Sequence, residues 1–281
     1  MDELTALRKG LSDLDAQLWE LFARRLGLVD QVAQWKMTTG TPIHVPEREQ
    51  VILAQARGSM PPGLEGYGEA LARTLLRLSR ERQYELAVER DASWTLGSAL
   101  RAAGTSQVGW ESLAVVPGAA EQVCPTIFPA ERLVHVSSAV EACSMVRSGQ
   151  VEGAVLPEGE ALAAADGETL FIQAAAAGAG RCFLLGGKLS VGEQANQVSL
   201  RVDLEPGPEA LALMVSVLAD LGLPILNLSA GHGGSSTQGC YVEFAGGRED
   251  PQVLRALYQL ERETWRLRLL GWYPVWTPIR E

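Results

Sequence analysis

The sequence predicts a multidomain protein in which a purely helical N-terminal domain precedes α/β domains. Three observations lead to this prediction. A leucine repeat with helical spacing fills the first 38 residues, Ala and Gly become frequent after Asp91, and a strand-like alternation begins at Val198. The length of 281 residues agrees, because it corresponds to about two domains, or three if they are small. We expect domains over 1–91, 92–190 and 195–281.

The first domain is expected to contain three helices, and the longest covers residues 3–38. Its seam has leucines at alternating spacings of three and four: Leu4, Leu7, Leu11, Leu14, Leu18 and Leu21. About 36 residues give a helix roughly 54 Å long, which is longer than a small domain is wide. Such a helix needs a partner for its apolar stripe, and a two-fold homodimer is the commonest solution.

Residues that typically end or begin helices predict the bounds of the other two helices of this domain. Gly40-Thr-Pro42 stops the first helix, and Pro46 opens a second that runs to about Arg57. A Gly/Pro-rich loop over 58–68 then precedes a third helix over about 69–90.

The rest of the chain predicts α/β structure. Short β-like runs such as 153–156 and helical stretches such as 138–148 indicate a small α/β lobe in the middle segment. After it, strands are expected at 198–204, 224–230, 239–245 and 266–273, with helices at 208–221 and 250–262. The resulting order βαββαβ is that of the ferredoxin-like motif.

Charge and cysteine content exclude several classes. A net charge of −10 argues against a nucleic-acid partner, which would favour a basic surface. No CxxC spacing supports a metal site, and we expect neither a metal nor a cofactor. No secretory signal and no membrane-spanning run is recognised, so we expect a cytoplasmic protein without a membrane partner. The cysteines are expected to be buried apolar residues: Cys124, Cys143, Cys182 and Cys240.

Two cations of the first helix share one face. Arg25 and Lys36 are eleven residues apart, which places them within about 20° of each other around the axis. Arg25 also occupies the seam position that follows Leu21, where a charge is costly unless an anion meets it. Arg8 faces elsewhere, and on a two-fold dimer it would reach the partner's pocket. Any one of these cations alone is more often part of a solvated surface.

Further polar residues lie on the other two helices. Arg48 and Glu49 come at the start of the second helix. Ser79 and Gln83 are four residues apart on the third, so they share a face.

These residues fall into motifs that resemble the all-helical chorismate mutase family over residues 4–85. The motifs occur in the family's order: Leu7-Arg8-x-x-Leu11-x-x-Leu14-Asp15, Leu21-Phe-Ala-Arg-Arg25, Val32-Ala-x-x-Lys36, Pro42-Ile, Pro46-Glu-Arg-Glu-Gln50 and Ser79-x-x-x-Gln83. The resemblance implies an intertwined dimer with two active sites that convert chorismate to prephenate. One departure is Val45, where several members carry an acid that orients the substrate.

The resemblance also implies a role for each polar residue. The carboxylates of the substrate would be held by Arg8 of the other protomer, Arg25 and Arg48. The ether oxygen of the breaking bond would be contacted by Lys36 and Gln83. Glu49 would accept a hydrogen bond from the ring hydroxyl, and Ser79 would support the hydroxyl or a carboxylate. The reaction is an intramolecular rearrangement of a dianion, which requires positioning and electrostatic stabilisation but no nucleophile.

Residues 195–281 resemble an ACT regulatory domain, with Glu205-Pro-Gly-Pro-Glu-Ala-Leu211 and Leu269-Leu-Gly-Trp-Tyr-Pro274 as the similar segments. The middle resembles part of a prephenate dehydratase, which makes the order that of the chorismate mutase–prephenate dehydratase family. Two features depart from that family: the middle is about half the expected length, and Gly180-Arg181-Cys182 replaces its Thr-Arg-Phe signature. We therefore interpret the middle as a degenerate dehydratase-like lobe.

Three functions remain open. The first is a chorismate mutase with a regulatory tail that responds to an aromatic amino acid. The second is a bifunctional chorismate mutase–prephenate dehydratase, and the third is a non-catalytic protein that senses an aromatic metabolite. A His232-Gly-Gly-Ser235 turn replaces the Glu-Ser-Arg-Pro turn of related ACT domains, so the identity of the effector stays open.

Overall fold

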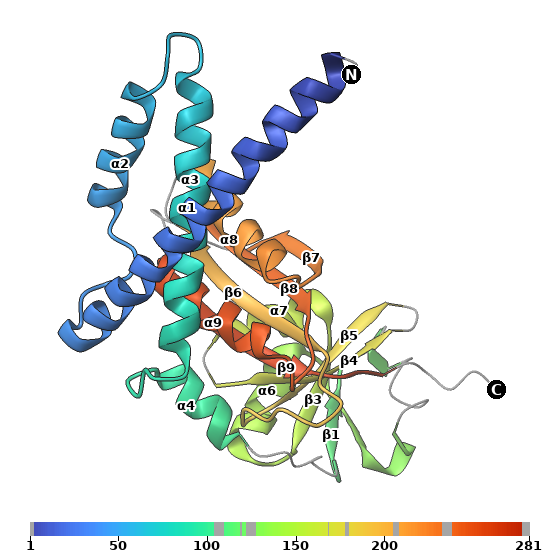
Figure 1. Ribbon diagram of the computed structural model, residues 1–281. Helices are drawn as coiled ribbons and strands as arrows, with labels where there is room; N and C mark the ends of the chain where they lie inside the picture. Colours follow the sequence, from blue (N-terminus) through green and yellow to red (C-terminus); the bar gives the residue numbers. More distant parts are fainter. Residues whose placement is uncertain are drawn as a thin grey trace. The chain divides into compact units, whose positions relative to one another are not determined.

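The computed structural model describes residues 3–103, 110–118, 120–121, 128–167, 169–177, 180–204, 208–231 and 238–276 (Figure 1). The chain forms two compact units, Met1–Ser93 and Trp94–Glu281. Cys124 and the 232–235 turn lie outside the described residues, as do the first residues of the 205–211 segment.

The N-terminal unit consists of three helices, as predicted. They are α1 (Glu3–Thr39), α2 (Pro46–Gly58) and α3 (Glu65–Val88). Gly40 ends α1 with a φ of +69°, a conformation that glycine adopts without strain. Pro46 stands at the first position of α2, where its missing N–H costs nothing.

The third helix begins four residues earlier than predicted. The sequence predicts a loop at Gly66 and Gly68, but both lie within α3. A Cβ at Gly68 would come within 2.3 Å of the Met60 side chain. Glycine at this position therefore permits a close approach between the helix and Met60 and does not mark a turn.

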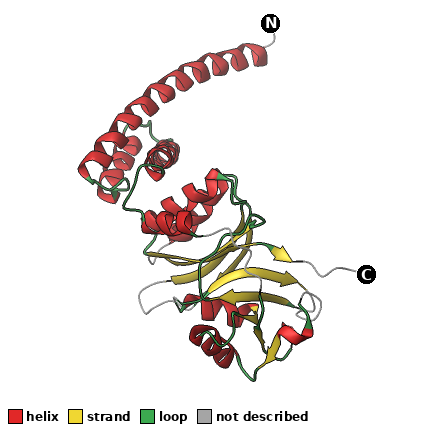
Figure 2. Ribbon diagram, turned by 90° about the horizontal axis from the view of Figure 1, so that it is seen from below, coloured by secondary structure: helices red, strands yellow, loops and turns green. Residues whose placement is uncertain are grey.

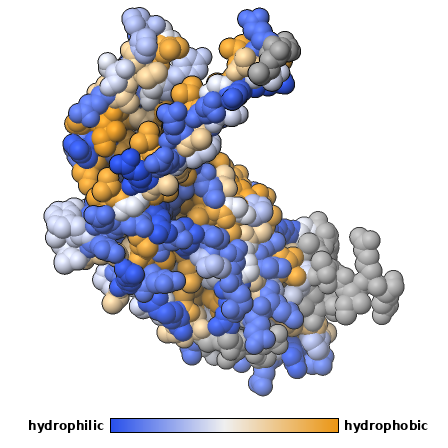
Figure 3. Space-filling view, viewed as in Figure 1, coloured by the Kyte–Doolittle hydropathy of each residue, from blue (hydrophilic) through white to orange (hydrophobic). Residues whose placement is uncertain are grey.

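Packing between the helices leaves much of α1 uncovered. Leu53 of α2 meets Ala72 and Leu76 of α3 in a small buried cluster, and Arg82 of α3 binds both carboxylate oxygens of Asp30 at 2.8 and 2.9 Å. The leucine seam of α1 remains exposed. Leu7, Leu11 and Leu14, for example, have relative exposures of 62–63%. Apolar surface is visible on this unit among hydrophilic side chains (Figure 3).

The second unit is built around one mixed sheet with helices on both sides (Figure 2). In its described part the strand order is β2-β1-β3-β5-β4-β9-β6-β8-β7, and β10 pairs with β4. The strands are β1 (Leu113–Val115), β2 (Leu133–His135), β3 (Gly153–Pro157), β4 (Phe171–Ala177), β5 (Arg181–Gly186), β6 (Gln197–Leu204), β7 (Ile225–Ala230), β8 (Gln238–Ala245), β9 (Arg266–Tyr273) and β10 (Val275–Trp276). The helices are α4 (Thr95–Ala102), the short 3₁₀ turn η1 (Ala130–Arg132), α6 (Ala139–Ser148), α7 (Glu158–Asp166), α8 (Pro208–Asp220) and α9 (Pro251–Glu263).

Local signals explain where α6 and α9 begin and end. The Ser138 hydroxyl accepts a hydrogen bond from the Glu141 N–H, and Gly149 ends α6 with a φ of +73°. Asp250 accepts from the Gln252 N–H at 2.9 Å, and Pro251 follows in the first turn of α9. These are standard helix-capping choices, which is why the sequence located both helices closely.

β4 of the middle segment pairs with two C-terminal strands and so joins them into one sheet. It pairs in parallel with β10 through Val275 and Trp276, and with β9 through Ile172 and Gly271. A Cβ at Gly271 would lie 2.3 Å from the Ile172 carbonyl oxygen, so only glycine allows the two strands to meet. The hydrophobic core extends across this junction, since Leu270 and Tyr273 belong to the same buried cluster as Leu113 and Leu156.

Three predicted core cysteines are confirmed: Cys143, Cys182 and Cys240 are buried with free thiols. Burial raises the pKa of each thiol above its ordinary value. None of the described helices combines the length and apolar character needed to cross a bilayer.

Candidate active site

The first group of predicted site residues joins α1 to α3. Nη1 of Arg25 donates to the Leu75 carbonyl at 3.2 Å and to the hydroxyl of Ser79. Gln83 donates from Nε2 to the Ser79 carbonyl at 3.0 Å. Partial burial lowers the pKa of the Arg25 guanidinium from its ordinary value, because the charged form loses hydration.

Gln83 has hydrogen-bonding capacity that its neighbours do not use. Its side chain is buried, and Oε1 has no hydrogen-bond partner among the described residues. The Nε2 amide carries two hydrogens, of which the bond to Ser79 uses one. A buried side-chain atom without a partner is costly, so part of the hydrogen-bonding capacity of Gln83 stays unused among the described residues.

A second group surrounds the start of α2. Nζ of Lys36 donates to the Ile43 carbonyl at 2.6 Å. The Glu49 carboxylate binds Nη1 of Arg80 with each of its oxygens at 2.6 Å, and His44 lies 3.8 Å from it. Burial lowers the pKa of Lys36, while the negative charge of Glu49 acts in the opposite direction. Lys36 and Glu49 therefore influence each other electrostatically.

The two remaining arginines stand apart from these groups. Arg8 on α1 and Arg48 on α2 are exposed. Within the described part of the chain, neither side chain is hydrogen-bonded to another predicted site residue. A single copy thus brings together Arg25, Ser79 and Gln83 in one group and Lys36 with Glu49 in another.

Sequence reasoning missed Arg80. It directly follows Ser79 in a stretch that also holds Arg77 and Arg82, so no spacing singles it out. Arg77 and Arg82 form ion pairs with Glu81 and Asp30. Only the packing of α2 against α3 shows that Arg80 meets Glu49.

The chemistry available is electrostatic. Guanidinium, ammonium and amide donors can hold carboxylates and stabilise charge on an oxygen without forming a covalent bond. The described residues contain no group of three or more His, Cys, Asp or Glu side chains suited to a metal ion.

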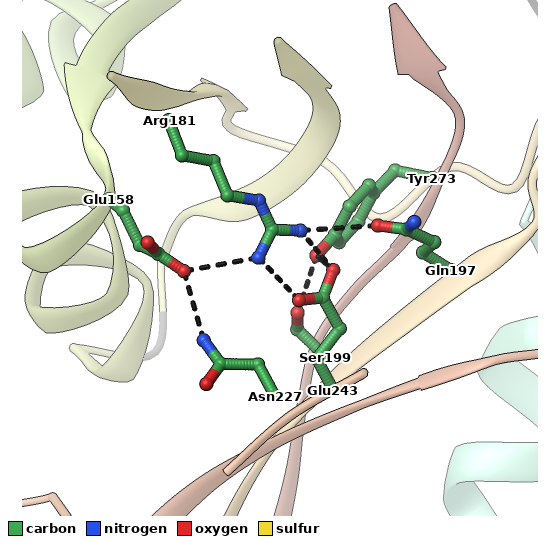
Figure 4. A network of polar contacts seen from close by, with 7 residues as sticks. All are labelled: Glu158, Arg181, Gln197, Ser199, Asn227, Glu243 and Tyr273. Carbon is green, nitrogen blue, oxygen red and sulfur yellow. Dashed lines mark hydrogen bonds and ion pairs between the residues drawn. The ribbon is translucent and has the colours of Figure 1, made fainter. Parts of the chain in front are cut away.

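A separate polar network lies in the second unit (Figure 4). Arg181 of β5 binds both carboxylate oxygens of Glu243 in β8, and it also donates to Glu158 and Gln197 at 3.1 Å each. Tyr273 donates to Glu243 at 2.9 Å and contacts Ser199 at 2.5 Å. Asn227 donates to Glu158 at 3.2 Å.

The network leaves Arg181 occupied by internal partners. Burial alone would lower the pKa of its guanidinium, but the hydrogen bonds and charge of Glu243 raise it overall. Burial and the same carboxylate raise the pKa of Tyr273 well above its ordinary value. Cys182 beside Arg181 is buried and carries no hydroxyl. The Arg181 guanidinium is therefore already paired with an internal carboxylate.

Comparison with known proteins assigns the first unit. Residues 7–84 match the family described as chorismate mutase type II. The T-protein of Enterobacter agglomerans is 49% identical over 55 residues, which are 20% of this chain and 15% of that protein. The chain therefore spans a small part of this curated relative's length.

Solved structures resemble the second unit. The match to GqqA, described as a novel type of quorum quenching acylase, covers 58% of this chain and 95% of the GqqA chain, with 20% identity and a TM-score of 0.52. The match to the prephenate dehydratase from Streptococcus mutans covers 59% of this chain and 99% of the dehydratase chain, with 19% identity and a TM-score of 0.51. At this identity the likeness shows a shared fold alone. Residues 7–84 thus carry a chorismate mutase type II domain, and the unit that follows shares the fold of a prephenate dehydratase.

Proposed function

We propose that the chain is a chorismate mutase that rearranges chorismate to prephenate. The observation that carries the proposal is the group of Arg25, Ser79 and Gln83, held together inside the segment that matches the mutase family. The substrate is a dianion, and the reaction breaks an ether bond while a carbon–carbon bond forms within the same molecule. The protein therefore has to hold one compact conformer and stabilise charge on the ether oxygen.

The carboxylates of the substrate are assigned to three arginines. Arg25 is already oriented by Ser79 and the Leu75 carbonyl, so little side-chain freedom is lost when a carboxylate binds. Arg48 is exposed at the start of α2 and able to turn toward a ligand. Arg8 supplies the third guanidinium from the partner subunit.

The ether oxygen is assigned to Lys36 and Gln83. The Lys36 ammonium has three hydrogens, so it can keep its bond to the Ile43 carbonyl while it donates to the ether oxygen. Gln83 contributes the second hydrogen of its amide. Glu49 accepts a hydrogen bond from the ring hydroxyl, and Ser79 supports the carboxylate through Arg25.

The active form in this proposal is a two-fold homodimer. The exposed leucine seam of α1 is too extensive for a stable single copy, because its large apolar side chains face water along the helix. Burying the seam against an identical helix would bring Arg8 of each chain to the pocket of the other.

For the second unit we propose a regulatory role. The elements β6-α8-β7-β8-α9-β9 follow the order βαββαβ, and their strands lie antiparallel in the order β9-β6-β8-β7. This order supports a ferredoxin-like ACT domain that binds an aromatic amino acid. The segment before it is proposed to be a degenerate dehydratase-like lobe, because Arg181 is held by Glu243.

The alternative is a bifunctional chorismate mutase–prephenate dehydratase, which the fold shared with the Streptococcus mutans dehydratase favours. One product analysis separates the two. Purified full-length protein is given chorismate, and prephenate and phenylpyruvate are followed by chromatography. Prephenate alone is the expected result. Phenylpyruvate would establish the bifunctional enzyme, and no loss of chorismate would refute the proposed function.

A further inference from the structure

We propose that Arg80 is a positioning residue of the mutase site, which holds the Glu49 carboxylate in place and keeps it from pairing with Lys36. This inference rests on the proposed chorismate mutase function. Arg80 belongs to none of the motifs that resemble the family, and the contact emerges only from the packing of α2 on α3.

The contact between the two side chains is short and shielded. One nitrogen, Nη1 of Arg80, lies 2.6 Å from each oxygen of Glu49. Only 12% of the Arg80 side chain and 18% of the Glu49 side chain are exposed. Charge-assisted hydrogen bonds of this kind are stronger than neutral ones, and they are weakened little by salt when shielded from water.

Besides Arg80, the described residues place the His44 imidazole and the Lys36 ammonium near Glu49. His44 Nε2 is 3.8 Å from Glu49 Oε2. Lys36 senses the carboxylate as well, because the charge of Glu49 opposes the decrease that burial causes in the Lys36 pKa. A Glu49 side chain released from Arg80 therefore has the Lys36 ammonium as an alternative partner.

Pairing of Glu49 with Lys36 would impair the reaction in two ways. It would remove the ammonium from the ether oxygen, where negative charge develops in the transition state. It would also turn the Glu49 carboxylate toward Lys36 and away from the ring hydroxyl whose hydrogen bond it is proposed to accept. Arg80 prevents both effects by balancing the Glu49 charge from the side of α3.

The test is a double-mutant cycle between Arg80 and Glu49, measured as chorismate turnover by the full-length protein. We expect Arg80→Met to lower kcat/KM by about 10- to 100-fold, the usual range for a lost charged hydrogen bond. In a Glu49→Gln background the same change should cost less than about threefold, because no carboxylate remains to be held. Arg80→Lys should recover most of the activity, since a single nitrogen makes both contacts.

A pH profile adds a readout that a purely structural role would not change. Loss of Arg80 leaves the Glu49 charge unbalanced, which raises the pKa of Lys36 and moves the alkaline limb of kcat/KM to higher pH. The matched control is Arg77→Met on the same helix, whose partner Glu81 is four residues away. We expect the Arg77→Met control to have the kcat/KM of the wild-type protein and the same alkaline limb in its pH profile.

Three results would overturn the inference: an Arg80→Met variant within twofold of wild type, an equal loss in the Glu49→Gln background, or an unmoved alkaline limb. An equal loss in both backgrounds would mean that Arg80 contacts the substrate or supports the fold. If Arg80→Met does not fold, an Arg80→Lys variant with the large loss expected for Met also refutes the inference. Inactive wild-type protein would refute the proposed mutase function instead, so the two failures are distinguishable.

Discussion

Arg181 in β5 binds the Glu243 carboxylate in β8 through both of its terminal nitrogens, across 62 positions of sequence. Glu243 is almost completely buried, with 5% of its side chain exposed. The pair connects a strand of the middle segment to a strand of the C-terminal segment. Arg181 thus links two segments of the second unit that lie far apart in the sequence.

This pair predicts a large loss of stability when one partner is removed. Breaking a buried ion pair costs about 3–5 kcal/mol, because the other charge stays buried without compensation. Arg181→Met should therefore lower the unfolding temperature of the second unit in calorimetry. Glu158→Gln removes a partner that is 31% exposed, so its effect should be much smaller. Equal unfolding temperatures for the two variants would contradict the prediction.

The lowered pKa of Lys36 predicts that alkaline pH decreases activity while it increases the contribution of this residue to stability. The catalytic form is the ammonium, so kcat/KM should fall as pH rises through a Lys36 pKa that lies below the ordinary 10.5. The folded protein binds fewer protons than the unfolded chain between those two values, so the contribution of Lys36 to the free energy of unfolding should increase over the same window. Lys36→Met should abolish this contribution in urea titrations at several pH values. A fall in kcat/KM that occurs only above pH 10.5 would contradict the assignment of Lys36 as the catalytic ammonium.

The apolar N-cap of α2, Val45, predicts that a polar residue at this position would increase the stability of the first unit. It occupies the N-cap position of α2 in an extended conformation, with no side-chain hydrogen bond to the first turn. Val45→Asp should stabilise the first unit by about 0.5–2 kcal/mol, since its carboxylate can accept a hydrogen bond from a backbone N–H of the first turn and its charge suits a helix N-terminus. Val45→Ala is the control without a cap. Equal denaturant midpoints for the Asp and Ala variants would exclude the capping explanation.

The exposed seam of α1 predicts an obligate dimer. Leu11 is 63% exposed in a single copy, and the proposed dimer would bury it. Leu11→Asp should shift the protein to monomer in sedimentation equilibrium and abolish turnover, because Arg8 no longer reaches the partner's pocket. Val140→Asp, at a residue that is 79% exposed in the second unit, should leave both properties unchanged. A fully active Leu11→Asp monomer would refute a shared active site.

The sequence predicted elements well wherever a periodic pattern met a clear terminator. The heptad seam located α1, Pro46 located the start of α2, and strand alternation located β6. It was wrong at Gly66 and Gly68. At Gly68 the reason is that a glycine needed for packing against Met60 has the same signature as a loop glycine, whereas Gly66 has open space around it. Within one helix, spacing also correctly placed Ser79 beside Gln83.

Contacts between distant segments could not be read from the sequence. Nothing in the chain near Arg80 or Glu49 indicates that the two side chains meet, since their contact depends on the angle at which α2 packs on α3. The Arg181 network has the same origin, because it requires the β4–β9 junction that Gly271 permits. The roles of Arg8 and Arg48 stay predictions that require a second copy and a ligand.

The most direct test of the account is the chorismate turnover of the full-length wild-type protein beside that of Lys36→Ala, with circular dichroism to verify the fold. Loss of one donor to developing charge typically lowers kcat by about 10²–10³. We predict that the wild type forms prephenate and that the variant, equally folded, is slower by at least that factor. A folded Lys36→Ala protein with near-normal kcat would contradict the claim that this ammonium stabilises the transition state.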